Sequence, residues 1–233
     1  MRILIYCDEG VDAFSFRQTY KTLKKILKAH FVVVKSHTLL EYLDKADLFV
    51  MPGGRDVFYH RALQGKKTDA LREFVENGGS YLGLCAGAYF GSKSIEFEKG
   101  HVHEVIEQRE LAFFPGKAIG PALGLGKYEP TSCRGAECAL IDTRMGSFGT
   151  YYNGGCYFEG SFSNAKPLAY FAKTGNVAIV ECSVGKGKAL LSGVHLEYSV
   201  KNLTEKQLAH ADIEVLKRDE ALRTDFTHYL LSI

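Results

Sequence analysis

The first third of the chain alternates short apolar runs with segments of helical periodicity. Residues 15–29 place apolar side chains on one side and lysines on another, which predicts an amphipathic helix. Residues 66–76 predict a second helix, ended by Asn-Gly-Gly, and residues 39–46 a short helix or turn. Four apolar runs between these segments predict buried strands, at residues 2–6, 31–34, 47–51 and 80–84. Strands that alternate with helices are typical of a parallel sheet covered by helices.

The pattern changes after Glu96, where glycines separate shorter apolar segments. We expect a more antiparallel section folded against the same sheet, with a hairpin turn at 185–187. Residues 204–231 predict a helix, with Thr204 as its N-cap. The strands predicted here lie at His101–Gln108, Leu123–Thr131, Cys138–Ile141, Phe148–Tyr152, Leu168–Ala172, Val177–Cys182 and Ala189–Ser192.

The charge pattern narrows the classes of partner. The 233 residues carry a formal net charge of +2, which is too small to indicate a nucleic-acid or membrane partner. The lysines of the first predicted helix are Lys21, Lys24, Lys25 and Lys28. We interpret them as a solvated face and not as a binding patch.

Length and composition fit one α/β domain over residues 1–233, with 46% hydrophobic residues. No apolar stretch is long enough to cross a membrane, and the short run before Cys7-Asp8-Glu9 does not resemble a secretory signal. The six cysteines are few for a disulfide scaffold. We therefore expect reduced thiols and a cytoplasmic protein.

A nucleophile-elbow pattern follows the fourth predicted strand, as Gly83-Leu84-Cys85-Ala86-Gly87. A sharp strand-to-helix turn projects the central side chain out of the sheet and needs small neighbours. At a helix N-terminus the thiol of Cys85 is favoured as thiolate, and the N–H of Ala86 is a candidate oxyanion donor. The alternative is a common glycine-rich strand end with an inert buried cysteine.

Two further segments supply the other parts of such a site. His195 and Glu197 follow the last predicted strand, and two residues apart they converge if the segment is extended. A histidine can serve as acid and base, and the carboxylate can orient its ring. Gly53 or Gly54, after the third strand, can bring a second N–H to the oxyanion. Each signal alone has a plain alternative, a surface pair or an ordinary turn, but together they predict a catalytic site at the strand ends.

These residues resemble the class I glutamine amidotransferase-like superfamily. Within it, the chain is most similar to the N-terminal amidotransferase-like domain of eukaryotic biotin–protein ligases and to free-standing bacterial relatives. The segments that carry the resemblance are Met51-Pro52-Gly53-Gly54-Arg55, Gly83-Leu84-Cys85-Ala86-Gly87-Ala88-Tyr89, Tyr151-Tyr152-Asn153-Gly154-Gly155 and Ser192-Gly193-Val194-His195-Leu196-Glu197.

The resemblance implies a flavodoxin-like three-layer α/β sandwich and a Cys85–His195–Glu197 triad. In amidases of the superfamily the thiolate attacks a carboxamide, ammonia leaves and water resolves the thioester. Glutaminases of the superfamily carry glutamine where this chain has Tyr89. The chain also lacks a Gly-Arg-Gly-Arg biotinoyl-adenylate motif, so we do not expect it to ligate biotin by itself.

Smaller features complete the predicted site. Arg55 is a candidate for binding a substrate carboxylate, while Tyr89 and Asn153 are candidate contacts of the pocket. His101 and His103 would share one face of a strand, but we find no further metal ligands near them. Cys133 and Cys138 do not have zinc-knuckle spacing. We expect neither a metal nor another cofactor.

Three functions remain open at this point. The leading one is a cysteine-dependent amidase or amidotransferase-like hydrolase acting on a small amide. The alternatives are a non-catalytic module that binds a small molecule in the same pocket, and a redox sensor with Cys7 as resolving thiol. Partners beyond the small molecule are a second copy of the chain or a separate acceptor protein.

Overall fold

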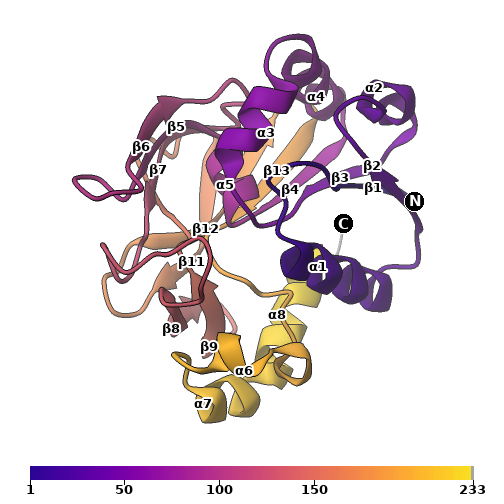
Figure 1. Cartoon of the computed structure of the whole chain (residues 1–233). Coiled ribbons are helices and arrows are strands. Elements are labelled where there is room, and N and C mark those ends of the chain that lie inside the picture. The colour runs from indigo at the N-terminus through magenta and orange to yellow at the C-terminus, as the bar shows by residue number, and fades with distance from the viewer. Residues whose placement is uncertain (232–233) are drawn as a thin grey trace.

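A computed structural model of the chain describes residues 1–231, with helices on both faces of one mixed sheet (Figure 1). One half of the sheet is parallel, as predicted for the N-terminal strands, and every neighbouring pair in it runs in the same direction. In spatial order this half comprises β2 (His30–Val34), β1 (Arg2–Tyr6), β3 (Leu48–Met51), β4 (Ser80–Leu84) and β13 (Gly187–Ser192).

The sheet continues beyond β13 with mostly antiparallel pairs, which confirms the predicted change of pattern. Only β5 and β7 pair in parallel in this section of residues 1–231. The main path runs on through β12 (Val177–Val184), β10 (Tyr157–Glu159), β7 (Phe114–Gly120), β5 (Ser92–Phe97) and β6 (Val105–Gln108). A branch leaves β12 through β11 (Ala165–Phe171), β8 (Ala136–Thr143) and β9 (Gly146–Asn153).

Helices cover the two faces of the parallel half (Figure 1). One face carries α1 (Ala13–Ile26) and α8 (Glu220–Leu231). The opposite face carries α2 (Leu39–Tyr42) with the 3-10 turn η1 (Leu43–Lys45), α3 (Asp56–Leu63), α4 (Lys66–Glu76) and α5 (Ala86–Phe90). Below β8 and β9 lie the short η2 (Val200–Asn202), α6 (Glu205–Leu208) and α7 (Ile213–Arg218).

The alternation of side chains along β1 shows why the sheet is covered on both sides. Ile3 and Ile5 pack into the core that includes α1 and α8, while Leu4 and Tyr6 pack into the core beneath α3 and α4. All four are fully buried. Full burial of such a side chain contributes about 1.5–3 kcal/mol, so both helical layers are needed to hold the strand.

Most of the predicted regular elements form near their predicted bounds. The helix at 66–76 and the strand at 80–84 match, and the helix predicted at 15–29 spans Ala13–Ile26. The continuous helix predicted over 204–231 is wrong, because Asp212 accepts hydrogen bonds from two N–H groups and begins a new helix there. Thr204 does cap α6, in a capping box with Gln207.

In the glycine-rich section one predicted strand is shorter than expected and another is absent. Only Val105–Gln108 of the predicted strand His101–Gln108 is extended, because His101 closes a turn onto the carbonyl of Glu98. Leu123–Thr131 is an irregular loop in which Gly124 and Gly126 have positive φ. The sequence patterns also missed five elements, which are α3, β5, β7, β10 and the 3-10 turn η2.

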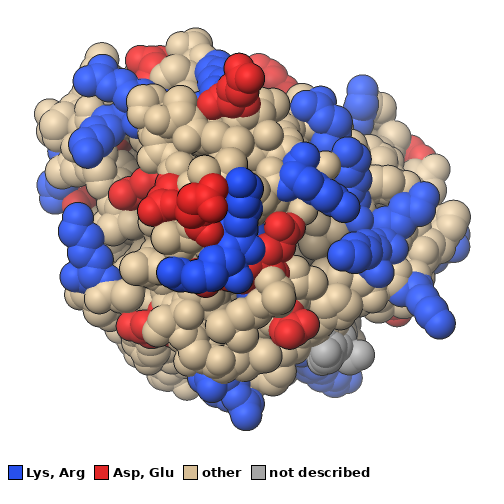
Figure 2. All heavy atoms as spheres, turned by 90° about the horizontal axis from the view of Figure 1, so that it is seen from below, with Lys and Arg blue, Asp and Glu red and all other residues tan. Residues whose placement is uncertain are grey.

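The surface carries the predicted lysine face of α1. Lys21, Lys24, Lys25 and Lys28 are all exposed, and Lys28 lies just beyond the end of α1. Figure 2 shows basic side chains on the right of the view, on the side of α1, and acidic and basic side chains intermixed near its middle. Within the part of the chain that the structure describes, no helix has the length and apolar character required to cross a membrane.

Candidate active site

Cys85 occupies the sharp turn between β4 and α5. Its backbone has φ 51° and ψ −104°, a conformation that costs of order 1–3 kcal/mol for a residue with a side chain. The turn is held by the N–H of Cys85, which donates to the carbonyl of Ser192 at 2.8 Å. A side chain at Gly83 would collide with the carbonyl of Gly87, and one at Gly87 with that of Met51. The two glycines of the predicted elbow are therefore required by close backbone packing.

His195 and Glu197 meet directly after β13. The Nδ1 atom of His195 lies 2.8 Å from Oε1 of Glu197, and the two side chains are 5% and 4% exposed. The N–H of His195 donates to the carbonyl of Tyr151 at 3.0 Å, which ties the segment to β9. Residues 196–197 form a turn and not the extended segment that we expected, but the two side chains still converge.

The other side of the imidazole faces the nucleophile position. The side chains of His195 and Cys85 hydrogen bond to each other. Burial by itself would lower the pKa of His195, but the charge of Glu197 and the hydrogen bonds with Cys85 and Glu197 raise it to about 10. At neutral pH the imidazole therefore holds its proton. The ring therefore presents a positive charge to the sulfur of Cys85.

Residues whose backbone N–H groups are candidate oxyanion donors line the same pocket as Cys85. Ala86 is the first residue of α5, so its N–H has no acceptor within the helix. Gly53 does not fit its predicted role as oxyanion donor, because its N–H donates to Oγ of Ser15 at 2.9 Å. Of the two predicted glycines, Gly54 is thus the one whose N–H remains for a substrate oxygen.

A pocket of about 690 Å³ opens above these residues, large enough for a small molecule. Arg55 at its wall is exposed, and its guanidinium lies 5.0 Å from the centre of the Phe58 ring. Arg55 makes no ion pair within residues 1–231. The predicted site residues that line the pocket are Cys85, His195, Gly53, Gly54, Ala86, Arg55, Tyr89 and Asn153.

Tyr89 and Asn153 are tied to the loop that follows β9. The hydroxyl of Tyr89 donates to the carbonyl of Gly154 at 3.0 Å, and Tyr89 is only 4% exposed. The carbonyl of Asn153 lies 3.9 Å from Sγ of Cys85. Tyr89 therefore braces the wall behind the sulfur, in addition to lining the pocket.

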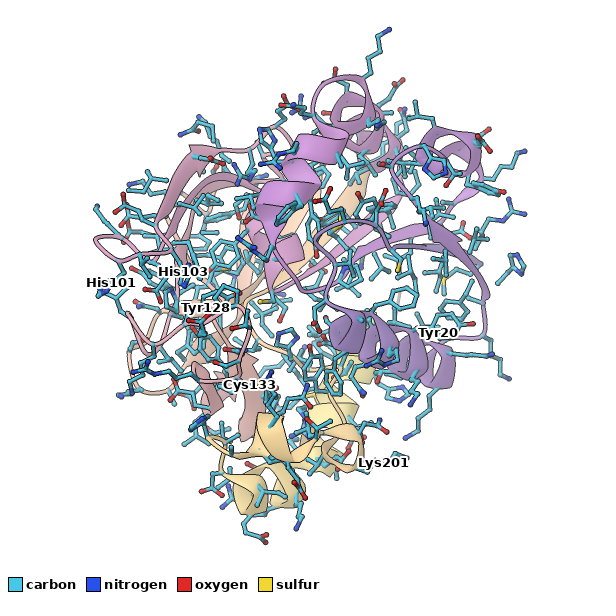
Figure 3. The ribbon with its side chains drawn as sticks, viewed as in Figure 1. Tyr20, His101, His103, Tyr128, Cys133 and Lys201 are labelled. Atoms are coloured by element: carbon cyan, nitrogen blue, oxygen red, sulfur yellow. The ribbon has the colours of Figure 1, made fainter. Side chains whose placement is uncertain are left out.

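Several pocket residues were missed by sequence reasoning. Tyr128 belongs to the loop between β7 and β8 and packs edge-on against Phe97 and His103, with ring centroids 5.0 and 6.1 Å apart (Figure 3). Cys133, from the same loop, hydrogen bonds to the side chain of Tyr151. Cys7 does not line the pocket, so Cys133 is the better candidate for a second thiol there. These contacts join segments far apart in the chain and leave no local pattern.

The predicted histidine pair does not share a strand face. His101 and His103 lie in the turn before β6, and His103 packs on Tyr128 while His101 lies further out (Figure 3). Within residues 1–231 no group of three or more His, Cys, Asp or Glu side chains is arranged to hold a metal ion.

Comparison with known proteins adds the family. The family model described as biotin-protein ligase, N terminal, matches residues 1–233. An uncharacterized protein of Chlamydia muridarum is 35% identical over 236 residues, which covers 95% of this chain and 90% of that protein. A biotin–protein ligase of Schizosaccharomyces pombe is 31% identical over 246 residues, which covers 100% of this chain but only 38% of the ligase.

Solved structures give the same fold. A crystal structure of a glutamine amidotransferase superposes with a TM-score of 0.61 at 21% identity, covering 95% of this chain and 98% of the other. A putative GMP synthase protein from Thermoplasma acidophilum gives 0.52 at 13% identity, covering 100% and 98%. The chain therefore belongs to the family of biotin–protein ligase N-terminal domains, with the α/β fold of glutamine amidotransferases.

Proposed function

We propose that this protein is a cysteine-dependent amidase or amidotransferase-like hydrolase that acts on a small amide. The observation that carries the proposal is the hydrogen-bonded chain from Cys85 through His195 to Glu197 at the floor of the pocket. Cys85 is the nucleophile, His195 the general acid and base, and Glu197 the group that orients the ring.

The reaction follows from these positions. The thiolate of Cys85 attacks the amide carbon, and the N–H groups of Ala86 and Gly54 stabilise the negative oxygen. The carbon–nitrogen bond then breaks as His195 gives its proton to the leaving ammonia. A water molecule loses a proton to His195 and attacks the thioester, which releases the acid and restores the thiolate of Cys85 beside the protonated His195.

The charged side chains of the pocket indicate which group the substrate carries away from its amide. The acidic residues near Arg55 already have partners: Asp12 caps α1 through the N–H of Ser15, and Asp56 pairs with Arg109 at 2.8 Å. Arg55 has no such partner among the described residues. We assign it to an anionic group at the far end of the substrate, such as a carboxylate.

The second candidate is a module that binds a small molecule without turnover. It is favoured by Tyr89, which stands where glutaminases of the fold carry glutamine and instead holds Gly154. In that case a ligand would stabilise the protein against thermal unfolding equally well with Cys85 or with alanine at that position, and no ammonia would be released.

Selective alkylation tests the leading proposal. We expect iodoacetamide near neutral pH to label Cys85 faster than the other thiols, and His195→Ala to remove that preference. Cys133 is the matched control, since it lines the same pocket and its hydrogen bond is to Tyr151. Equal labelling of Cys85 and Cys133 in the wild-type protein would contradict an activated nucleophile.

A further inference from the structure

The imidazole of His195 is enclosed by two tyrosine rings. Tyr198 stacks on it with ring centroids 4.2 Å apart and planes 26° apart. Tyr151 lies with its ring centroid 6.1 Å from the imidazole and also stacks on Tyr198, at 5.2 Å. Tyr198 is 6% exposed, so the stack is shielded from water.

Tyr198 is itself fixed from the side of α1. Phe14 packs edge-on against it, with centroids 5.1 Å apart and planes at 82°. The side chains of Tyr198 and Ser15 hydrogen bond to each other, and Oγ of Ser15 accepts the N–H of Gly53 at 2.9 Å. The first turn of α1 thus holds both the ring that covers the imidazole and the glycine turn of the pocket.

This arrangement suits a positively charged ring. The face of an aromatic ring is negative, so a cation stacked on it is stabilised. Burial, and then the charge of Glu197, raise the pKa of Tyr198 well above its usual value, so its phenol stays neutral and the ring face acts without a phenolate charge. The titratable groups that face the imidazole or its two covering rings are Cys85, Glu197, Tyr151, Tyr198, Cys133 and, further out, Asp12.

We propose that Tyr198 is a positioning residue for the base, which holds the imidazole plane between Cys85 and Glu197 and stabilises its protonated form. The catalytic meaning of this role rests on the proposed function. The stacking itself exists whether or not the protein turns over a substrate. Of the two covering rings, Tyr198 lies close and nearly parallel to the imidazole, whereas Tyr151 is tilted by 55°.

The test is a pH titration of His195, monitored by nitrogen NMR. It is done in Cys85→Ser, because the thiol of Cys85 would otherwise titrate together with the imidazole. We expect Tyr198→Leu to lower the pKa of His195 by about one unit. Tyr198→Phe keeps the ring, so we expect it to change the pKa of His195 much less. If the leucine variant does not fold, phenylalanines with increasing fluorination at position 198 keep the shape and weaken the negative face. They should lower the pKa of His195 step by step.

A pKa of His195 that is the same with the phenylalanine, leucine and fluorinated side chains would overturn the proposal. The failure of the proposed function has a different signature, which is equal alkylation of Cys85 and Cys133 in the wild-type protein. The pH profile of Cys85 alkylation in Tyr198→Leu tests the role of Tyr198 and the proposed function together. We expect the high-pH limb of this profile, where His195 loses its proton, to move down by about one pH unit, and Tyr198→Phe to show little of that shift.

Discussion

At the scale of single residues, the site depends on which partners each polar group already has. Gly53 and Gly54 look equivalent in the sequence, but Ser15 occupies the N–H of Gly53 and leaves that of Gly54. Arg55 has no ion pair among residues 1–231, whereas Asp56 in the same pocket pairs with Arg109. Local motifs identified Cys85 and the His195–Glu197 pair. They did not identify Ser15, whose contact with Gly53 spans 38 positions of the chain.

The charge of Arg55 can be tested with two reagents of similar size. Anionic iodoacetate and neutral iodoacetamide both alkylate Cys85, and we expect Arg55→Gln to slow the reaction with iodoacetate relative to iodoacetamide by about threefold. Arg61→Gln is the matched control, since Arg61 also lies over the Phe58 ring but does not line the pocket. An unchanged ratio of the two rate constants in Arg55→Gln would rule out this role of the arginine.

The glycine turn offers a second test at this scale. A Cβ atom at position 53 would lie 2.9 Å from Cε1 of His195 and 2.8 Å from Oγ of Ser15. We expect Gly53→Ala to move the imidazole and to slow the alkylation of Cys85 by about tenfold. The rate constant for Cys133 measures any general change of the pocket. A loss that is the same at both thiols would point to misfolding and not to displacement of the base.

At the scale of elements, the pocket is built where strand ends meet loops from the antiparallel half. The parallel strands were predictable because each is a nearly continuous apolar run bounded by turn residues, as at Ser80–Leu84. The strand Phe114–Gly120 was missed because Pro115, Gly116 and Gly120 interrupt its pattern. The loop predicted as a strand at Leu123–Thr131 is held by tertiary contacts, such as Tyr128 on Phe97, that no local pattern reveals.

The tether between α5 and the loop after β9 gives a prediction at this scale. Tyr89→Phe leaves the buried carbonyl of Gly154 without its donor, so we expect the free energy of unfolding to fall by about 1–3 kcal/mol. Urea unfolding measures the difference. Tyr20→Phe is the control, because Tyr20 is a half-buried tyrosine on α1, away from the pocket (Figure 3). A loss in Tyr89→Phe no larger than in Tyr20→Phe would show that the tether adds no stability.

At the scale of the whole molecule, the raised pKa of His195 makes the free energy of unfolding depend on pH. Because the charge of Glu197 raises the pKa of His195, we expect folded Cys85→Ser to keep on His195 a proton that the unfolded chain releases near pH 6.5. The stabilisation is complete below that pH, and the free energy of unfolding should fall as the pH rises through the raised pKa. Cys85→Ser with His195→Gln is the control, and unfolding at several pH values measures both. Equal slopes in the two proteins would mean that His195 does not bind the extra proton.

The proposed function requires that Cys85 is a thiolate beside a protonated His195. The far-ultraviolet absorbance that distinguishes a thiolate from a thiol measures this charge state directly, without a substrate or a reagent. At neutral pH we predict that Cys85→Ser removes the absorbance of one thiolate, that His195→Gln removes the same amount, and that Cys133→Ser removes none. If the absorbance of Cys85→Ser equals that of the wild-type protein at neutral pH, Cys85 is a neutral thiol and the claim is contradicted.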